Sequence, residues 1–456
     1  MELSESERDD VVAWGRAHRF KHRLEKVHFV DQAAAAIAAA GSADRLLARG
    51  MGRSYGDSAL NADQILLDIT GLDRFISFDP QSGVLECEAG VTLAAILHLL
   101  EHRTSGQPWF LPVTPGTKFV TIGGAIANDV HGKNHHRAGC FGNHVLSLHL
   151  QRSNGERLTC SRQENVALFE ATIGGLGLTG LILSARIALQ PVPGFALEAE
   201  DLRYGSLDDF FQLSDDSLAD WEYGVAWLDC LSSGANLGRG VFSRARHIAL
   251  SPGMQMRTRR QTQLSMPLDF PGFLLNRYSI GVFNKLLWHK ASDVPRRHVK
   301  HYDPVFYPLD TIGQWNRMYG RRGFYQYQCV VPSGNAKNAI RALLSAISRS
   351  GEGSFLAVLK TFGDIGSPGM LSFPMPGATL ALDFSNRGTR TLALLNELDL
   401  ITAAAGGRIY PAKDGRVSAA NFQLGYPRWR EFSQHIDPKF SSSFWRRVSQ
   451  GSSVAA

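Results

Sequence analysis

Two glycine-rich stretches of the sequence have the residue types that bind phosphate groups. The first, RGMGRSYGDSAL at residues 49–60, combines three glycines with two arginines and an aspartate. Backbone amides around flexible glycines can surround an anion without the help of a helix. A second pair, Gly123 and Gly124, permits another close approach of the backbone to a ligand. A tight turn would explain the first stretch alone, but the two stretches together favour a bound pyrophosphate. Because both groups are negatively charged, Asp57 would have to face away from that pyrophosphate.

A third stretch, GGLGLTG, matches the dinucleotide fingerprint GxGxxG at Gly175, Gly177 and Gly180. That fingerprint requires a strand before it and a helix after it. Here ALFEA, before the glycines, has the composition of a helix, and LILSARIAL, after them, alternates like a strand. The order is reversed, so we do not expect a Rossmann-type site.

Four histidines, His131, His135, His136 and His144, are candidates for acid–base chemistry. We expect His131 to be functional, because it directly follows the apolar turn IGGAIANDV, and the other three to be structural or solvated. Four histidines could also bind a metal ion, but no Glu or Cys completes a recognisable ligand spacing. We therefore predict no metal site.

Lys413, in the segment YPAKDGR, is a second candidate. A desolvated lysine has a lowered pKa, so it can act as a base, and its charged form can stabilise negative charge. The alternative is a surface lysine paired with Asp414, and the residues alone favour that alternative. Gln326 and Gln328, in the alternating YQYQ, are expected on one face of a single strand.

The composition limits the class of protein. The chain has 456 residues, enough for two domains, and its 44% hydrophobic and 20% charged residues are typical of a globular protein. The net charge of +6 forms no dominant basic stripe, which favours an anionic ligand or a membrane surface over a nucleic acid. Five scattered cysteines are expected to be reduced thiols. With no secretion signal and no apolar run of about 18 residues, we expect a cytoplasmic protein.

The glycine-rich stretches must be positioned by alternating helices and strands. Helices are predicted in VDQAAAAIAAAGSA and TLAAILHLLEHR, strands in QILLDIT and GVLECEAG, and a hairpin in VLSLHLQRSNGERLTC. Residues 110–143 are so rich in Gly, Pro, His and Asn that they predict a long functional loop, too polar for the core.

Prolines and later elements predict the domain limits. Pro191 and Pro193 interrupt the first pattern, and the strands and helices after them predict a second α+β domain. We expect a first domain at 1–193, a second at 194–405, and a basic, aromatic C-terminal segment at 406–456 that returns to the first domain.

Three motifs carry a resemblance to a known family. RGMGRSYGD, PGTKFVTIGGAIANDVHGKNHHRAGCFGNHV and GGLGLTGLI resemble the FAD-binding domain of vanillyl-alcohol-oxidase type flavoproteins. The resemblance implies a two-domain α+β flavoprotein, whose α+β substrate domain is built on an antiparallel sheet and covers the isoalloxazine. It also implies the residues that bind FAD, namely Arg49, Gly50, Met51, Gly52, Arg53, Ser54, Tyr55, Gly56, Pro115, Gly116, Thr117, Thr121, Gly123, Gly124, Ala127, Asn128, His131, Gly132, Asn134, His135, Gly177, Gly180, Ile182 and Tyr410.

One position departs from the wider family. Many members attach the flavin covalently to a histidine in a loop that reads roughly R-S-x-G-H, and this sequence has Asp57 at that position. Aspartate cannot form that bond to the flavin 8-methyl group. We therefore expect non-covalent FAD.

A narrower resemblance concerns the substrate. HGKNHH, FPMPG and RIYPAKD are similar to the branch of the family that oxidises the 2′-hydroxyl of decaprenylphosphoryl-β-D-ribose. It implies oxidation of a polyprenyl-phosphate-linked pentose to a 2-keto sugar, the first half of an epimerisation that supplies cell-wall arabinan precursors. An NAD(P)H-dependent short-chain reductase is the implied partner. The implied catalytic residues are Lys413 and His131, and the implied substrate-binding residues are Tyr55, His131, Gln326, Gln328, Lys360, Ala381 and Lys413.

The chemistry requires two functions from the site. Oxidation of a secondary alcohol by a flavin needs a hydride acceptor, flavin N5, and a protein group that takes the hydroxyl proton. Ala381 stands where some members carry a cysteine facing the pocket, a difference that changes the shape of the pocket and leaves the reaction class intact. An alditol or aldonolactone oxidase that releases hydrogen peroxide is the enzymatic alternative. A sugar- or lipid-binding protein that keeps FAD structurally is the non-enzymatic one.

The segment 269–300 mixes apolar and basic residues. This composition suits a segment that lies on an anionic membrane surface, here the inner face of the membrane. A buried helix with a basic outer edge explains it equally well. The apolar residues are Phe273, Leu274, Leu275, Phe283, Leu286, Leu287 and Trp288, and the basic ones are Arg277, Lys285, Lys290, Arg296 and Arg297.

Overall fold

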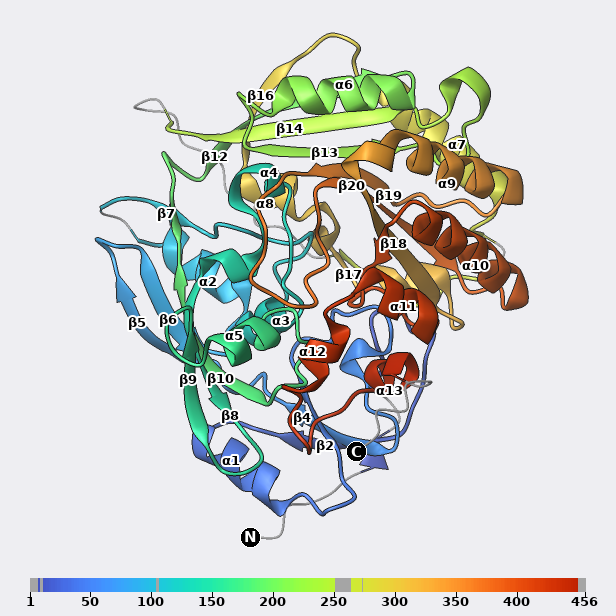
Figure 1. Cartoon of the computed structure of the whole chain (residues 1–456). Coiled ribbons are helices and arrows are strands. Elements are labelled where there is room, and N and C mark those ends of the chain that lie inside the picture. The colour runs from blue at the N-terminus through green and yellow to red at the C-terminus, as the bar shows by residue number, and fades with distance from the viewer. Residues whose placement is uncertain (1–6, 9–10, 104–105, 251–263, 273, 450–456) are drawn as a thin grey trace.

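The computed structural model describes residues 7–8, 11–103, 106–250, 264–272 and 274–449. The chain forms two lobes, one above the other in the view of Figure 1. Residues up to β11 (Gln190–Pro191) make up the lower lobe, and β12 (Ala196–Tyr204) begins the upper one. The last helices of the chain return to the lower lobe, as Figure 1 shows.

Two sheets organise the lower lobe. The first has the order β1-β2-β4-β3, with β2, β4 and β3 parallel, and the second has the order β5-β6-β10-β8-β9 and is antiparallel. The strands are β1 (Glu7–Arg8), β2 (His22–Lys26), β3 (Leu46–Arg49), β4 (Gln64–Asp68), β5 (Phe75–Asp79), β6 (Val84–Glu88), β7 (Trp109–Phe110), β8 (Val145–Gln151), β9 (Arg157–Ser161) and β10 (Leu181–Ala188). The predicted strands and the β8–β9 hairpin are confirmed.

The lower lobe carries α1 (Val30–Ala39) and α2 (Leu93–Glu101), as predicted, and α5 (Val166–Thr172). Helix α5 precedes the third glycine stretch and strand β10 follows it. This order is the reverse of a Rossmann unit, so the expectation against such a site is confirmed.

The loop predicted at residues 110–143 is largely irregular and lines the cavity described below, but the expectation that it is too polar for the core was wrong. This segment contains α3 (Ile122–Ala127) and α4 (His135–Ala138), and the side chains of Ile122 and Ile126 are fully buried. Its glycines allow close packing, because a Cβ added to Gly123 would lie 3.1 Å from the Cβ of Ala89. The glycines therefore serve the core as well as a ligand.

An eight-stranded sheet with the order β16-β12-β14-β13-β19-β20-β18-β21 forms the upper lobe, and its pairs are antiparallel. A short parallel pair, β15 with β17, lies apart from it. The strands are β13 (Tyr223–Leu228), β14 (Gly240–Ile248), β15 (Leu264–Ser265), β16 (Arg297–His301), β17 (Ile312–Gly313), β18 (Phe324–Pro332), β19 (Ala357–Phe362), β20 (Gly377–Ser385) and β21 (Arg408–Ile409).

Helices cover one face of the eight-stranded sheet. Helix α6 packs on β13 and β14, and α9 and α10 pack on β18. Side chains alternate between the faces of a strand. Tyr327 and Cys329 therefore point into the helix-covered core, while Gln326 and Gln328 point into a cavity on the opposite face. The helices are α6 (Leu207–Ser217), α7 (Arg277–Lys290), α8 (Tyr302–Phe306), α9 (Ala336–Ser350) and α10 (Thr389–Ala404).

The C-terminal segment joins the two lobes. Its strand β21 adds an edge to the upper sheet, and its helices α11 (Ala419–Gly425), α12 (Trp429–Ser433) and α13 (Ser443–Ser449) follow. Backbone hydrogen bonds between Leu46 and both Lys439 and Ser441 fix the segment on β3 of the lower lobe. The domain limits at 193 and 405 remain a prediction.

Short 3₁₀ helices lie at Asp57–Ala59, Phe141–His144, Gly234–Asn236, Pro308–Thr311, Trp315–Tyr319 and Ser333–Asn335.

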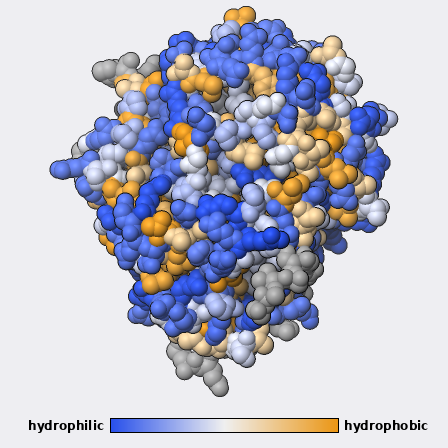
Figure 2. Space-filling model, in the orientation of Figure 1, coloured by the Kyte–Doolittle hydropathy of each residue, from blue (hydrophilic) through white to orange (hydrophobic). Residues whose placement is uncertain are grey.

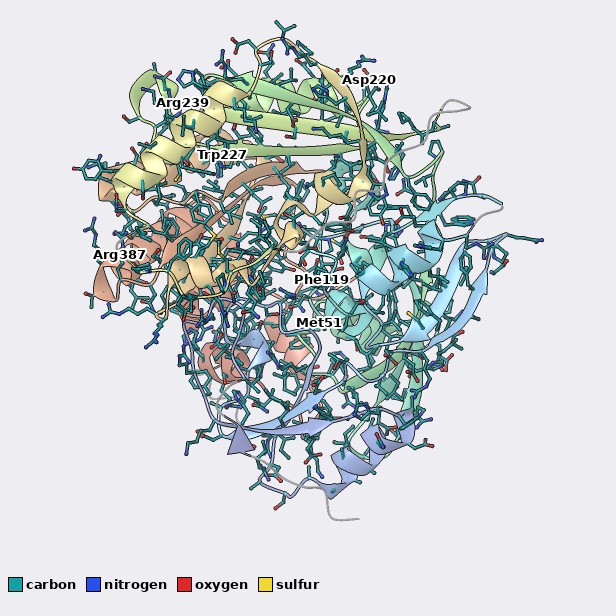
Figure 3. The ribbon with its side chains drawn as sticks, turned by 180° about the vertical axis from the view of Figure 1, so that it is seen from behind. Met51, Phe119, Asp220, Trp227, Arg239 and Arg387 are labelled. Atoms are coloured by element: carbon teal, nitrogen blue, oxygen red, sulfur yellow. The ribbon has the colours of Figure 1, made fainter. Side chains whose placement is uncertain are left out.

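Figures 2 and 3 show the two opposite sides of the molecule. The face in Figure 2 is mostly hydrophilic, with its hydrophobic residues in small groups. Figure 3, seen from behind, shows the yellow helix α7 on the outside of the upper lobe, with Arg239 beside it. The guanidinium of Arg239 lies 4.9 Å from the ring centre of Trp288 on α7. Among the described residues, no helix has the length and apolar character needed to cross a bilayer.

Candidate active site

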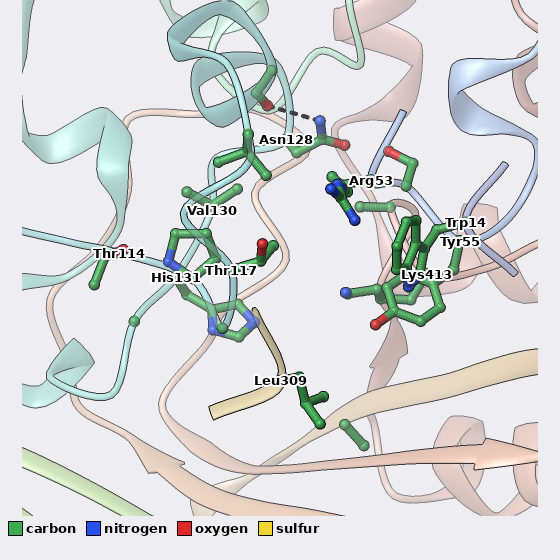
Figure 4. Close-up of a pocket in the computed structure, with 18 of the residues that line it drawn as sticks. Trp14, Arg53, Tyr55, Thr114, Thr117, Asn128, Val130, His131, Leu309 and Lys413 are labelled. Atoms are coloured by element: carbon green, nitrogen blue, oxygen red, sulfur yellow. Dashed lines mark hydrogen bonds between the residues drawn. The ribbon is translucent and has the colours of Figure 1, made fainter. Parts of the chain in front are cut away.

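A cavity of about 800 Å³ has walls from both lobes. The glycine-rich stretches line it from the lower lobe, and the open face of the eight-stranded sheet lines it from the upper lobe. Figure 4 shows His131 and Thr117 on one side of it and Trp14, Tyr55 and Lys413 on the other. A cavity of this size between two lobes can hold a cofactor and a substrate together.

The cavity gathers most of the predicted site residues. All seven residues predicted to bind substrate line it, and all but three of those predicted to bind the cofactor do so. The cofactor set that lines it is Arg49, Gly50, Met51, Gly52, Arg53, Ser54, Tyr55, Pro115, Gly116, Thr117, Thr121, Gly123, Gly124, Ala127, Asn128, His131, Gly132, Gly177, Gly180, Ile182 and Tyr410. The substrate set is Tyr55, His131, Gln326, Gln328, Lys360, Ala381 and Lys413.

Three predicted cofactor residues lie outside the cavity lining. Gly56 packs on the C-terminal segment, since a Cβ there would lie 1.7 Å from the carbonyl oxygen of Asp414. The side chain of Asn134 is buried and donates to the carbonyl of Pro112 at 2.9 Å. His135 packs on the ring of Phe362, 4.6 Å away between ring centres. These residues shape the loops instead of lining the ligand space.

Two other histidines have structural partners. Nε2 of His136 lies 3.3 Å from the carbonyl oxygen of Trp221, and Nε2 of His144 lies 2.8 Å from that of Ala138. Within the described ranges, no group of three His, Cys, Asp or Glu side chains is arranged to hold a metal ion.

Polar atoms in the glycine-rich half of the cavity lack partners among the described residues. Nη1 of Arg49, Nε of Arg53 and Oγ of Ser58 are buried without a hydrogen bond. Burial lowers the pKa of both arginines, and an unpartnered buried polar group costs free energy that a bound anion would recover. Gly52 has a φ of +61°, and a Cβ there would lie 2.3 Å from Nη2 of Arg49, so a larger residue would strain the backbone and displace the guanidinium. The residues therefore fit the pyrophosphate of FAD.

Asp57 faces away from this half of the cavity, as expected. Its carboxylate accepts hydrogen bonds from Nη2 and Nε of Arg447 at 2.7 and 3.0 Å. The same Nη2 donates to Asp414 at 2.9 Å. Arg447 thus connects the first glycine-rich stretch with the segment that carries Lys413.

His131 lines the cavity and has a polar neighbour at each of its ring nitrogens. Its Nε2 is 3.0 Å from the side-chain amide of Gln328, and its Nδ1 is 3.1 Å from Nζ of Lys360. Burial, with the neighbouring charge of Lys360, holds the pKa of His131 well below its ordinary value. The ring is therefore neutral near pH 7 and can hydrogen-bond a hydroxyl without carrying charge.

Lys413 points into the cavity, so the alternative of a surface lysine paired with Asp414 is wrong. Its Nζ lies 3.9 Å from the ring centre of Tyr55, while Asp414 is held by Arg447 and by backbone amides. Burial lowers the pKa of Lys413 to about 8, and the carboxylate of Asp383 opposes that shift. Lys413 can therefore exchange a proton near neutral pH.

Asp383 is a buried carboxyl group that sequence reasoning missed. It accepts hydrogen bonds from Nε2 of Gln326 at 2.6 Å and from the hydroxyl of Tyr319 at 3.4 Å. Burial raises its pKa to about 7, although Gln326 and the charge of Lys413 act in the opposite direction. The alternating pattern of GATLALDF was an available signal for Asp383. Side chains two positions apart in a strand share a face, so Asp383 lies on the same face as Ala381, which was predicted to bind substrate.

Other lining residues also escaped the sequence analysis. Lys133 stands two residues after His131, so its place in HGKNHH was an available signal. Trp14 stacks under the guanidinium of Arg53 at 4.1 Å but comes from an N-terminal segment without a motif. Trp227 lines the cavity from β13, where only the strand could be predicted.

Comparisons with known proteins identify the family of this chain. The family described as FAD binding domain matches residues 26–161. Over 421 residues, the chain is 39% identical to decaprenylphosphoryl-beta-D-ribose oxidase of Mycolicibacterium smegmatis, an alignment that covers 88% of this chain and 89% of that protein. The chain belongs to the decaprenylphosphoryl-β-D-ribose oxidase family. It is a two-domain α+β flavoprotein that uses FAD to oxidise a CH–OH group, and the predicted resemblance is confirmed.

Two further relatives show how far the similarity extends. A Streptomyces coelicolor protein described as an uncharacterized protein in the mprA 5′ region is 36% identical over 77% of this chain and 99% of its own length. L-gulono-1,4-lactone dehydrogenase of Mycobacterium tuberculosis is 31% identical over only 36% of each chain. The similarity to the decaprenylphosphoryl-β-D-ribose oxidase therefore covers far more of the chain than the similarity to the lactone enzyme.

Proposed function

We propose that this member of the family oxidises the 2′-hydroxyl of a pentose linked to a polyprenyl phosphate, which yields a 2-keto sugar. The observation that carries the proposal is that His131, Gln328, Lys360 and Lys413 line the same cavity as the unpartnered groups that fit the FAD pyrophosphate. The similarity to the Mycolicibacterium smegmatis oxidase over most of both chains supports the same substrate class.

The residues of the site have separate tasks in this oxidation. FAD, when bound, supplies the two-electron acceptor. Neutral His131 and the amide of Gln328 orient the sugar hydroxyl by hydrogen bonds. The neutral amine of Lys413 can take the hydroxyl proton, and its ammonium form can stabilise negative charge that builds in the site. Apolar walls such as Val358 and Leu356 keep water from the reacting atoms.

Anaerobic bleaching of the flavin tests the proposed function. We expect a short-chain prenylphosphoryl ribose to bleach the purified protein, and alditols and aldonolactones to leave it yellow. Rapid bleaching by a soluble polyol, with hydrogen peroxide released in air, would favour the alditol or aldonolactone oxidase. A flavin that no sugar bleaches would favour the binding protein.

A keto sugar on a lipid carrier needs a second enzyme to complete an epimerisation. An NAD(P)H-dependent short-chain reductase would supply the hydride that converts the 2-keto group to the opposite hydroxyl configuration. We include this partner in the proposal because its reaction consumes the product of the first.

FAD is proposed to bind without a covalent bond. Asp57, which occupies the position of the usual tether, is buried and held by Arg447 at 2.7 Å, so it presents no nucleophile to the flavin. Acid precipitation is expected to release the flavin into the supernatant, where its absorbance can be measured. Yellow colour that stays in the washed, denatured pellet would show a covalent bond instead.

Helix α7 supports a peripheral contact with the inner face of the membrane. Tyr278, Val282 and Leu286 repeat every four residues on its exposed face, while Asn284 is buried and donates to Asp229 at 2.8 Å. The helix is therefore neither buried nor polar on its outer side.

Two residues predicted for the interface, Leu287 and Trp288, are half-buried, and Trp288 donates to the carbonyl of Tyr204 at 3.1 Å. Phe273 lies outside the described residues.

The double variant Val282→Ser/Leu286→Ser is expected to sediment less with anionic liposomes than the wild type does. These side chains are 61% and 67% exposed, so the substitutions remove apolar contact with lipid without opening the core. The matched control is Leu400→Ser/Leu424→Ser, both 67% exposed on α10 and α11. Equal sedimentation of the two double variants would contradict a contact through α7.

A further inference from the structure

Two lysines in the cavity form no ion pair with a carboxylate in the part of the chain that the structure describes, although Asp201 lies near enough to favour the charged form of Lys133. Lys133 and Lys360 both line the cavity, and neither forms an ion pair there. Lys300, in the same lining, is paired with Asp201 at 3.2 Å. Burial lowers the pKa of Lys133 to about 8, and burial with the charge of Lys133 lowers that of Lys360 to about 7. Two unpaired ammonium groups cost folding free energy that an anionic ligand would recover.

Lys360 contacts His131, and Lys133 lies near enough to Lys360 for its charge to lower the pKa of that lysine. Nζ of Lys360 is 3.1 Å from Nδ1 of His131 and 3.2 Å from the carbonyl oxygen of Gly132. Lys133 follows His131 by two residues, and its Nζ donates to the carbonyl of Val305. Gln328 contacts the opposite nitrogen, Nε2, of the same ring. An anion held by the two lysines therefore lies directly beside the group that orients the reacting hydroxyl.

The proposed substrate requires an anion site at this place. In a pentose phosphorylated at C1, the phosphate-bearing carbon is bonded to C2, the carbon that is oxidised. The phosphate must therefore sit next to the residues that hold the 2′-hydroxyl. Val305 and Phe306 form an apolar wall near Lys133, whose Nζ is 5.8 Å from the ring centre of Phe306. That wall suits the apolar ester group of a lipid phosphate.

We propose that Lys133 and Lys360 together bind the phosphodiester that joins the sugar to its lipid, and so select substrates phosphorylated beside the oxidised carbon. This inference rests on the proposed function. The phosphates of FAD are the other source of such an anion. Unpartnered groups for them lie on Arg49, Arg53 and Ser58 in the lower lobe, whereas Lys360 belongs to β19 of the upper lobe.

The test compares two substrates of the holoenzyme, farnesylphosphoryl-β-D-ribose and farnesyl β-D-riboside, which lacks the phosphate. The wild type is expected to prefer the phosphorylated substrate in kcat/KM. Loss of one charge-assisted contact to the phosphate is expected to lower its kcat/KM about tenfold or more in Lys133→Gln and in Lys360→Gln. Because Lys133 does not touch His131, its variant should change KM and leave kcat nearly unchanged. The matched control is Lys300→Gln, whose charge Asp201 already neutralises.

The double variant Lys133→Gln/Lys360→Gln decides the outcome. The inference is supported if this double variant oxidises the two substrates with similar kcat/KM and keeps the wild-type ratio of FAD to protein. In addition, Lys300→Gln must still prefer the phosphorylated substrate. A double variant that keeps the wild-type preference refutes the lysine site while the proposed function stands. Loss of FAD from the double variant would assign the lysines to the cofactor and also refute the site. A wild type that oxidises neither substrate overturns the proposed function itself, and the inference with it.

Discussion

Replacing Lys413 with alanine is expected to slow anaerobic reduction of the flavin by substrate on the order of a hundredfold, or ~3 kcal/mol. The ammonium lies in the cavity beside Tyr55 with no ion-pair partner among the described residues, so its charge is available to the reaction. FAD should stay bound, because the groups that fit its pyrophosphate lie in the glycine-rich half. Stopped-flow absorbance at saturating substrate measures the rate, and the ratio of flavin to protein measures retention.

Two further variants give this prediction its controls. Lys413→Arg keeps the positive charge and cannot act as a base, so substantial recovery of the rate would indicate an electrostatic role. Lys337→Ala removes a half-exposed lysine that pairs with Asp208 on the surface, and it should leave the rate unchanged. Reduction of Lys413→Ala at nearly the wild-type rate would remove Lys413 from the catalytic residues.

The pH dependence of the same rate separates the two roles of Lys413. With a pKa of about 8, the neutral amine predominates above that pH and the ammonium below it. A base role predicts a rate that rises with pH and levels off above about 8, and a charge role predicts a rate that falls there. Asp383→Asn removes a carboxylate that favours the ammonium, so the inflection should move to lower pH in either case. An unmoved inflection would contradict the coupling of these two residues.

Replacing Arg447 with alanine is expected to lower the free energy of unfolding by about 3–5 kcal/mol, because it leaves two buried carboxylates without their cation. The side chains of Asp57 and Asp414 are 5% and 2% exposed, and both lie within 3 Å of the guanidinium. Arg416, whose backbone amide also holds Asp414, pairs its guanidinium with Asp399 and cannot replace it. Urea denaturation of the holoprotein, followed by tryptophan fluorescence, measures the change.

The control for this substitution is Arg349→Ala. Arg349 pairs with Glu397 at 3.2 Å, but the two side chains are 68% and 49% exposed, so its loss should cost less than about 1 kcal/mol. If Arg447→Ala were no more destabilising than this control, water would have to solvate the carboxylates of Asp57 and Asp414. The two ion pairs of Arg447 would then not hold the C-terminal segment in place.

Local patterns in the sequence predicted many of the helices and strands, and the family resemblance named most of the residues that line the cavity. The alternation of YQYQ placed Gln326 and Gln328 on the cavity face, because side-chain direction in a strand depends only on the parity of the position. The motifs around Gly52 and Gly123 line the same cavity, as the prediction of two glycine-rich stretches around one ligand requires. Backbone geometry within a few residues explains both successes.

Contacts between distant segments could not be predicted. Arg447 lies 390 residues from Asp57, and no local pattern indicates which arginine neutralises that aspartate. Asp383 was missed because its role depends on Gln326 of the neighbouring strand and on Lys413 of another segment. The polar composition of residues 110–143 gave no sign that small glycines let the short helix Ile122–Ala127 pack tightly into the core.

The position of Arg447 in the chain also sets an order of events during biosynthesis. The ribosome completes the glycine-rich stretches first, yet Tyr410, Lys413 and Arg447 emerge only after the whole upper lobe has been translated. Domains generally fold as units from the N-terminus during synthesis, so we expect the lower lobe to begin folding before Arg447 is available to pair with Asp57. The flavin site is therefore expected to be completed late in folding, and a chain without Arg447 would leave Asp57 and Asp414 without this shared cation.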